Sequence, residues 1–166
     1  MELGLQNKIA LITGASRGLG RAIAWQLATE GCSVVIIARG SKTLTHTAEE
    51  LQQAGFRVLA ISADVRVRAD LERVVQETLI HYRSIDILVH NAGGANGLDV
   101  LDTSEADWQE ALALNVTALA TLTQLVVPVM RQNGGGRIIA ISSIYGRESG
   151  GTMAYNALKA ASISLT

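Results

Sequence analysis

Proline and cysteine are almost absent from this chain of 166 residues. The single proline is Pro128, where an average usage of about 5% would give roughly eight. The single cysteine, Cys32, lies in an apolar run, so no disulfide can form within the chain and we expect a reducing, cytoplasmic location. Charged residues are also scarce, at 17% with a net charge of −1. This composition excludes a disordered polyelectrolyte and argues against binding to nucleic acid.

Long hydrophobic runs are also limited. The N-terminal residues MELGLQNK have no basic start leading into an apolar stretch, so they do not resemble a secretory signal. Residues 111–130 lack charge, but asparagine, threonine, glutamine and Pro128 interrupt them, and we expect no membrane span. We expect a helix buried on its own sheet and on a partner subunit, kinked near its end by Pro128.

Short β-branched apolar runs alternate with longer segments of helical periodicity. The helical segments are predicted at about 18–30, 42–54, 68–82 and 104–132, the last opened by Ser104 as its N-cap. This alternation predicts an α/β fold, a doubly wound parallel sheet with helices on both faces. The predicted strands are Ile9–Thr13, Val34–Ala38, Val58–Ile61, Ile85–Val89 and Ile138–Ser142.

Glycine is plentiful, with sixteen residues, and its placement is informative. Clusters within 14–20, 93–97 and 146–151 follow the predicted carboxyl ends of the first, fourth and fifth strands. Ligands of open α/β sheets bind at that edge, where the strand order reverses. We therefore expect the binding site there, although glycines also serve tight turns. The cluster at 134–136 precedes a strand and is interpreted as a turn.

The first cluster forms the loop Thr13-Gly14-Ala15-Ser16-Arg17-Gly18-Leu19-Gly20 between a strand and a helix. Its glycines permit a tight turn and let a pyrophosphate approach the backbone, while the helix N-terminus supplies free N–H groups. The second strand ends at Arg39, where an acidic residue would bind the ribose of NAD. A cation there, with Arg17 and Lys42, favours the 2′-phosphate of NADP. The alternative is a solvated loop charge.

Tyr155 and Lys159 lie four residues apart and share one face of a predicted helix. A neighbouring ammonium stabilises a phenolate, which would make the tyrosine a proton donor and acceptor. Such a pair is common by chance on a helix surface. Ser143, at the end of the fifth predicted strand, adds a hydroxyl on the ligand edge. The three histidines, His46, His81 and His90, lack the spacing of metal ligands, and no metal site is predicted.

Taken in order, these motifs resemble those of the classical short-chain dehydrogenases/reductases. His90 is a departure, because many members carry another asparagine at that position. Within the family the chain is most similar to 3-oxoacyl-carrier-protein reductases and related carbonyl reductases. The residues that carry the resemblance are the loop at 13–20, Asp64-Val65, Asn91-Ala92-Gly93, Asn115, Ser143, Tyr155 and Lys159.

The resemblance implies a Rossmann fold and hydride transfer between NADP(H), with NAD less favoured, and a small carbonyl or secondary alcohol substrate. It implies that Tyr155 exchanges a proton with the substrate oxygen and that Ser143 hydrogen-bonds to that oxygen. Lys159 would hold the nicotinamide ribose, and Asn115 would support a proton relay. A homodimer or homotetramer is implied as well. The implied cofactor-binding residues are Gly14, Ser16, Arg17, Gly18, Leu19, Gly20, Arg39, Asp64, Val65, Asn91, Ala92, Gly93, Tyr155 and Lys159.

Family members continue beyond the helix that carries Tyr155, with two more strands and a segment that closes over the substrate. We therefore expect residues 1–166 to form a single dinucleotide-binding domain that lacks the C-terminal strands. The apolar run at 137–142 would then be an exposed sheet edge. Two hypotheses follow: the N-terminal part of a reductase, or a truncated, non-catalytic dinucleotide-binding or association module. The visible substrate rims would be residues 94–98 and 144–152.

Overall fold

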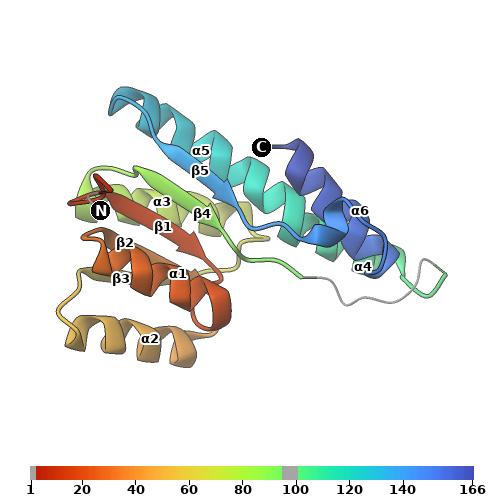
Figure 1. Ribbon diagram of the computed structural model, residues 1–166, viewed down its shortest axis with the longest axis horizontal. Helices are drawn as coiled ribbons and strands as arrows, with labels where there is room; N and C mark the ends of the chain where they lie inside the picture. Colours follow the sequence, from red (N-terminus) through yellow and green to blue (C-terminus); the bar gives the residue numbers. More distant parts are fainter. Residues whose placement is uncertain (1–2, 95–100) are drawn as a thin grey trace.

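A computed structural model describes residues 3–94 and 101–166 of the chain. Its strands form one parallel sheet in the order β3-β2-β1-β4-β5, with the strand order reversing beside β1 (Figure 1). Parallel strands need crossover connections, and helices supply them here. The predicted α/β fold is therefore confirmed. The strands are β1 (Ile9–Thr13), β2 (Ser33–Ala38), β3 (Val58–Ser62), β4 (Ile87–His90) and β5 (Arg137–Ala140).

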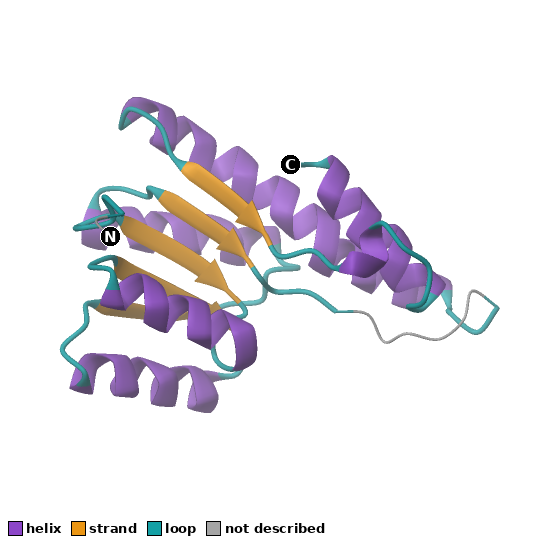
Figure 2. Ribbon diagram, viewed as in Figure 1, coloured by secondary structure: helices purple, strands orange, loops and turns teal. Residues whose placement is uncertain are grey.

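Helices cover both faces of the sheet (Figure 2). α1 (Gly18–Thr29) and α2 (Ser41–Gln53) lie on one face, and α3 (Arg68–Tyr82) and α5 (Ala118–Gln132) lie on the other. α4 (Glu105–Leu112) and α6 (Met153–Ser164) extend past the carboxyl ends of the strands.

The two helical layers explain why the strand sequences are continuously apolar. Successive residues of a strand point to opposite faces, so both faces must be apolar when both are covered. In β1, Leu11 belongs to the core beneath α3 and α5, while Ala10 and Ile12 belong to the core beneath α1 and α2. All three side chains are fully buried. Burial of each large apolar side chain contributes about 1.5–3 kcal/mol.

The long predicted helix at 104–132 is helical throughout, but it contains an irregular turn. Ser104 caps its start by accepting a hydrogen bond from the Asp107 amide at 3.2 Å. Between α4 and α5 the chain forms a π-helical turn, η1 (Ala113–Thr117). Pro128 lies inside α5, which continues to Gln132. The irregular turn therefore surrounds Asn115 and not Pro128, where a kink was predicted.

By length and composition, one stretch of the described residues, Glu105–Gln132, could cross a membrane. In the structure this stretch lines the core instead. Ala118, Leu122 and Val126 of α5 are fully or almost fully buried in the cluster that packs beneath the sheet.

Every strand except β1 differs from its predicted bounds: β2 and β3 are each longer by one residue, and β4 and β5 differ at both ends. β4 begins at Ile87 rather than Ile85, because Asp86 bonds to the Ile9 amide through its carboxylate, at 2.9 Å. It continues to His90. β5 ends at Ala140 rather than Ser142, because the chain turns there towards the short helix η2 (Ile144–Gly146).

β5 is the edge of the sheet within the described residues, where it pairs with β4 alone. Ile139 is 47% exposed. The predicted exposed edge at this strand is therefore confirmed. Beside it lies a cavity of about 330 Å³, lined by Leu119, Ala120, Thr123, Ile138, Leu165 and Thr166.

Candidate active site

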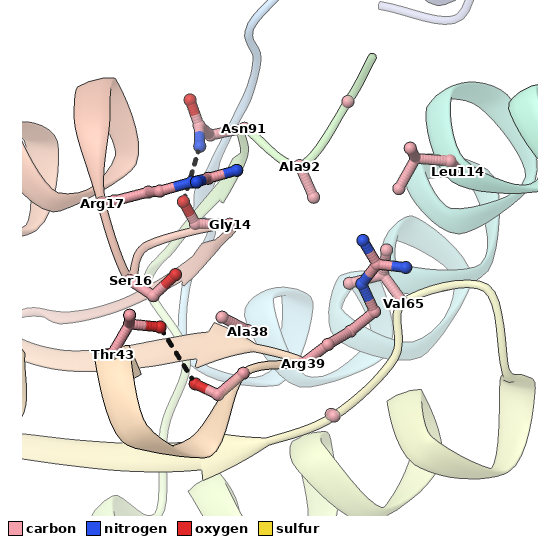
Figure 3. Close-up of a pocket in the computed structure, with 13 residues that line it drawn as sticks. Gly14, Ser16, Arg17, Ala38, Arg39, Thr43, Val65, Asn91, Ala92 and Leu114 are labelled. Atoms are coloured by element: carbon pink, nitrogen blue, oxygen red, sulfur yellow. Dashed lines mark hydrogen bonds between the residues drawn. The ribbon is translucent and has the colours of Figure 1, made fainter. Parts of the chain in front are cut away.

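A cavity of about 360 Å³ opens at the carboxyl ends of β1, β2 and β4, the edge that the glycine clusters predict (Figure 3). Eight of the residues that the sequence assigns to a cofactor lie on its wall: Gly14, Ser16, Arg17, Arg39, Val65, Asn91, Ala92 and Gly93. Its other lining residues are Ala38, Gly40, Thr43, Ala63 and Leu114.

The loop between β1 and α1 forms one wall of the cavity. Gly14 has a φ of 66°, and a Cβ there would lie 3.0 Å from the Cα of Ala92 on the opposite wall. Only glycine permits both this backbone conformation and this approach. α1 has no side-chain cap at Arg17, so its first N–H groups are left for a ligand. Gly18, Leu19 and Gly20 form this first turn rather than lining the cavity.

Two arginine side chains place positive charge at the border of the cavity. Arg39 follows β2, and Arg17 extends from the glycine loop, so both guanidinium groups border the cavity (Figure 3). The segment Ala38-Arg39-Gly40 contains no carboxylate, and α2 begins there without a side-chain cap. Thr43 on the first turn of α2 donates to the Gly40 carbonyl at 3.3 Å. These features fit a nicotinamide dinucleotide, whose pyrophosphate would lie at the N-terminus of α1.

Asp64 lies behind the cavity wall, while its neighbour Val65 lines it. The Arg66 guanidinium donates to both carboxylate oxygens of Asp64 and also pairs with Glu110 of α4. Hydrogen bonding to Arg66 holds the pKa of Asp64 below its usual value. The carboxylate is therefore fixed and ionised next to a residue of the cavity lining.

Asn91 ties the two walls of the cavity together. Its side-chain amide donates to the carbonyls of Thr13 and Gly14, each at 3.1 Å. Its backbone N–H donates to the Thr13 hydroxyl. The glycine loop and the segment after β4 are therefore held at a fixed separation.

Lys159 and Tyr155 lie on α6, beside this cavity rather than on its wall. The Lys159 ammonium is 6% exposed, donates to the Ile141 carbonyl at 2.9 Å and lies 5.6 Å from the Tyr155 ring centroid. Burial lowers the pKa of Lys159. A Cβ on Gly93 would lie 3.0 Å from the Lys159 Nζ, so the ammonium reaches the cavity wall at this glycine.

Asn115 approaches the same glycine segment from η1. Its side chain accepts from the Gly94 amide at 3.1 Å and donates to the carbonyls of Gly94 and Ala111 at 2.7 and 2.8 Å. The side chain is buried, and these bonds use both of its polar atoms. The structure thus brings Asn115, Lys159 and the wall of the cavity together. Of the predicted rim at 94–98, residues 95–98 lie outside the described residues.

Two serines at the end of β5 differ in how their protons are used. The Ser142 hydroxyl donates to the Lys159 carbonyl at 3.1 Å. Ser143 Oγ accepts from the Tyr145 amide at 3.2 Å, and within the described residues its own proton has no acceptor. Ser143 is therefore the serine that can donate to a ligand oxygen.

Residues 8–166 match the family model for short chain dehydrogenases. The chain belongs to the short-chain dehydrogenase family. Among characterised family members, it is 38% identical over 143 residues to 7α-hydroxysteroid dehydrogenase of Escherichia coli K12, covering 86% of this chain and 56% of that enzyme. It is 36% identical over 162 residues to the 3-oxoacyl-(acyl-carrier-protein) reductase of Staphylococcus epidermidis, covering 96% of this chain and 66% of the reductase.

Solved short-chain dehydrogenase structures superpose closely on this chain. One is 7α-hydroxysteroid dehydrogenase complexed with NADH and 7-oxo glycochenodeoxycholic acid, with a TM-score of 0.93 and 36% identity, covering 97% of this chain and 63% of that one. Another is actinorhodin polyketide ketoreductase with NADPH, with a TM-score of 0.93 and 32% identity, covering 96% and 62%. The chain thus spans less than two thirds of the length of these short-chain dehydrogenases.

Sequence reasoning did not assign several residues of this short-chain dehydrogenase site. Thr43 and Gly40 could have been assigned to the site from the sequence, because they stand at the start of the helix that follows β2. Leu114 carries none, because it is one apolar residue in a long apolar helix and reaches the cavity through the π-helical turn. Thr13 and His90 do not line the cavity, but they meet behind its wall at 3.3 Å.

Proposed function

We propose that this protein transfers a hydride between a nicotinamide dinucleotide and a carbonyl or secondary alcohol substrate. The observation that carries the proposal is that Lys159, beside the Tyr155 ring, and Asn115 both approach Gly93 on the cavity wall. A bound dinucleotide supplies or accepts the hydride. Membership in the short-chain dehydrogenase family supports the same reaction.

The residues of the chain then have distinct roles in handling the proton. Tyr155 exchanges a proton with the substrate oxygen, and the Lys159 ammonium lies near the Tyr155 ring. Ser143 donates a hydrogen bond to the same oxygen as negative charge develops on it. Asn115 holds the Gly94 backbone, which keeps the wall next to Lys159 in place.

Replacing Tyr155 tests this assignment. We expect Tyr155→Phe to lower kcat by about 10³-fold, because the phenolic proton is lost while the ring remains. NADPH affinity should stay within about twofold, since the aromatic ring and the neighbouring Lys159 ammonium remain. Tyr82→Phe, on the distant helix α3, is the matched control and should leave both quantities unchanged. Turnover by Tyr155→Phe at the unaltered rate would refute this role of Tyr155. The substrates assayed should include ketones and 3-oxoacyl thioesters.

Dinucleotide preference is a second part of the proposal. We propose NADP over NAD, because Arg17 and Arg39 border the cavity and no carboxylate stands at the end of β2. A ribose phosphate accepts charge-assisted hydrogen bonds from a guanidinium, whereas a carboxylate would bind the free ribose hydroxyls.

The ratio of NADPH to NADH dissociation constants measures this preference. We expect Arg39→Asp to move the ratio by at least about tenfold towards NADH, or ~1.4 kcal/mol. Lys42→Asp introduces the same charge change three residues away on an exposed position outside the cavity lining. It should have a smaller effect. Tighter NADH binding by the unaltered protein would contradict the NADP assignment.

A non-catalytic dinucleotide-binding module is the competing function, because the cavity is lined by the residues assigned to the dinucleotide while Tyr155 and Lys159 lie beside it. One comparison distinguishes the enzyme from the non-catalytic module. Dinucleotide binding without carbonyl-dependent oxidation of NADPH would identify the module, whereas turnover that depends on Tyr155 would identify the enzyme.

A further inference from the structure

His90, the last residue of β4, is a buried titratable side chain that the proposed reaction does not use. It is 3% exposed and lies behind the cavity wall. Its Nδ1 atom lies 3.3 Å from the hydroxyl of Thr13, the last residue of β1, which is fully buried. The two side chains therefore join the strands at which the order of the sheet reverses.

The hydrogen bonds around Thr13 determine which nitrogen of His90 carries a proton. The Thr13 hydroxyl oxygen accepts from the backbone amides of Asn91 and Ala92, at 3.1 and 3.0 Å. Both amides can only donate, so they occupy the two acceptor positions of the hydroxyl. Its one proton is then directed to His90, and Nδ1 must accept it. The ring is therefore the neutral tautomer with its proton on Nε2.

The surroundings of the ring favour this neutral form. Burial, together with repulsion from the Lys159 ammonium, lowers the pKa of His90 to about 4, against an opposing effect of the Leu114 backbone. A protonated ring would carry donors on both nitrogens and could not accept from Thr13. Nε2 is buried without a hydrogen-bond partner among the described residues. The hydrogen bond of this side chain is thus the one between Nδ1 and the Thr13 hydroxyl.

We propose that His90 is a positioning residue for the dinucleotide cleft. By accepting the Thr13 proton, it aims the lone pairs of the hydroxyl at the Asn91 and Ala92 amides. Those amides belong to one wall of the cavity, and Thr13 leads directly into Gly14 on the other. His90 therefore sets the separation of the two walls. That the cleft binds a dinucleotide rests on the proposed function. The tautomer of His90 and the hydrogen bonds between the two walls do not.

Two substitutions separate the acceptor from the bulk of the ring. Asn Oδ1 and His Nδ1 are both bonded to Cγ, so His90→Asn keeps an acceptor at the same position. His90→Leu keeps an apolar volume without an acceptor. Leaving the buried Thr13 proton unpaired should weaken NADPH binding about tenfold in His90→Leu, while His90→Asn stays within about twofold of the unaltered protein. Equal affinities in all three proteins, or an equal loss in both variants, would overturn the proposal.

Two further measurements need no dinucleotide, and the first of them needs no variant. Long-range ¹H–¹⁵N correlation spectra at neutral pH should show His90 with an unprotonated Nδ1 and a protonated Nε2. The exchange of the Asn91 and Ala92 amides with solvent should be slow in the unaltered protein and in His90→Asn, and faster in His90→Leu. A proton on Nδ1 would overturn the proposal, even where His90→Leu fails to fold. If the unaltered protein binds no dinucleotide, the proposed function fails, while the tautomer and the amide exchange still decide the role of His90.

Discussion

Burial controls the charge of the two basic side chains that meet behind the cavity. Lys159 keeps a hydrogen bond from its ammonium to the Ile141 carbonyl, which offsets part of the cost of burying a charge. For His90, burial and repulsion from the Lys159 ammonium outweigh the opposing effect of the Leu114 backbone. The site therefore holds one positive charge where two basic groups are present, and it holds that charge next to the Tyr155 ring.

The neutral state of His90 makes folding stability depend on pH. Its folded pKa of about 4 lies below the ordinary value of 6.5, so the unfolded chain binds the extra proton first as the pH falls. The free energy of unfolding should be highest above pH 6.5 and should fall by about 3 kcal/mol as the pH drops towards 4. Urea unfolding at pH 4.5, 5.5, 6.5 and 7.5 measures this slope.

His90→Asn is the control for this pH dependence, because it lacks a titrating ring. Its stability should be flatter between pH 6.5 and 4.5. Asp64 and Asp70 also have lowered pKa values, both through hydrogen bonds, but their contribution is present above their ordinary value of 3.8 and lost below it. They therefore act at a lower pH. An identical slope in His90→Asn would contradict the buried, neutral histidine.

At the scale of the element, the π-helical turn η1 places Asn115 against the glycine segment. A regular α-helix from Glu105 to Gln132 would bond each carbonyl along the helix, whereas here the Asn115 side chain takes up the Ala111 carbonyl. Single π-turns inside α-helices commonly accompany functional sites. The irregular turn thus has an identifiable cause in one side chain.

We expect Asn115→Ala to destabilise the protein by about 1–3 kcal/mol, because the partly buried Gly94 amide and carbonyl lose their partner. Asn133→Ala, at the exposed end of α5, removes one hydrogen bond to Ser84 and should cost less than about 0.5 kcal/mol. The free energy of unfolding in urea compares the two. Equal costs would show that the Gly94 contacts contribute little to stability.

The sequence pattern predicts these elements unevenly, for physical reasons. The bounds of β1 match the prediction, because a strand covered on both faces is a continuous apolar run that polar residues end. The π-helical turn was missed, because five residues of altered pitch do not disturb an apolar pattern that surrounds the whole helix. The role of His90 was missed as well, because it depends on Thr13, 77 positions earlier.

At the scale of the whole molecule, the sheet is covered on both faces but open at β5. Within the described residues, this strand has one hydrogen-bonded neighbour, and Ile139 is 47% exposed. Unpaired N–H and C=O groups beside an exposed isoleucine form a template for pairing with another strand.

We therefore expect the 166-residue chain to self-associate through the β5 edge, and Ile139→Lys to suppress this association. A lysine on an edge strand disfavours strand pairing, and a half-exposed position tolerates it at a cost of about 1 kcal/mol or less. Ile80→Lys is the matched control, because Ile80 is 74% exposed on α3, away from the edge. Sedimentation velocity over a roughly tenfold concentration range should show a rising mass for the unaltered chain and for Ile80→Lys, and a constant mass for Ile139→Lys. A rising mass in all three proteins would place the contact elsewhere, because the charge at position 139 would then have left the associating surface intact.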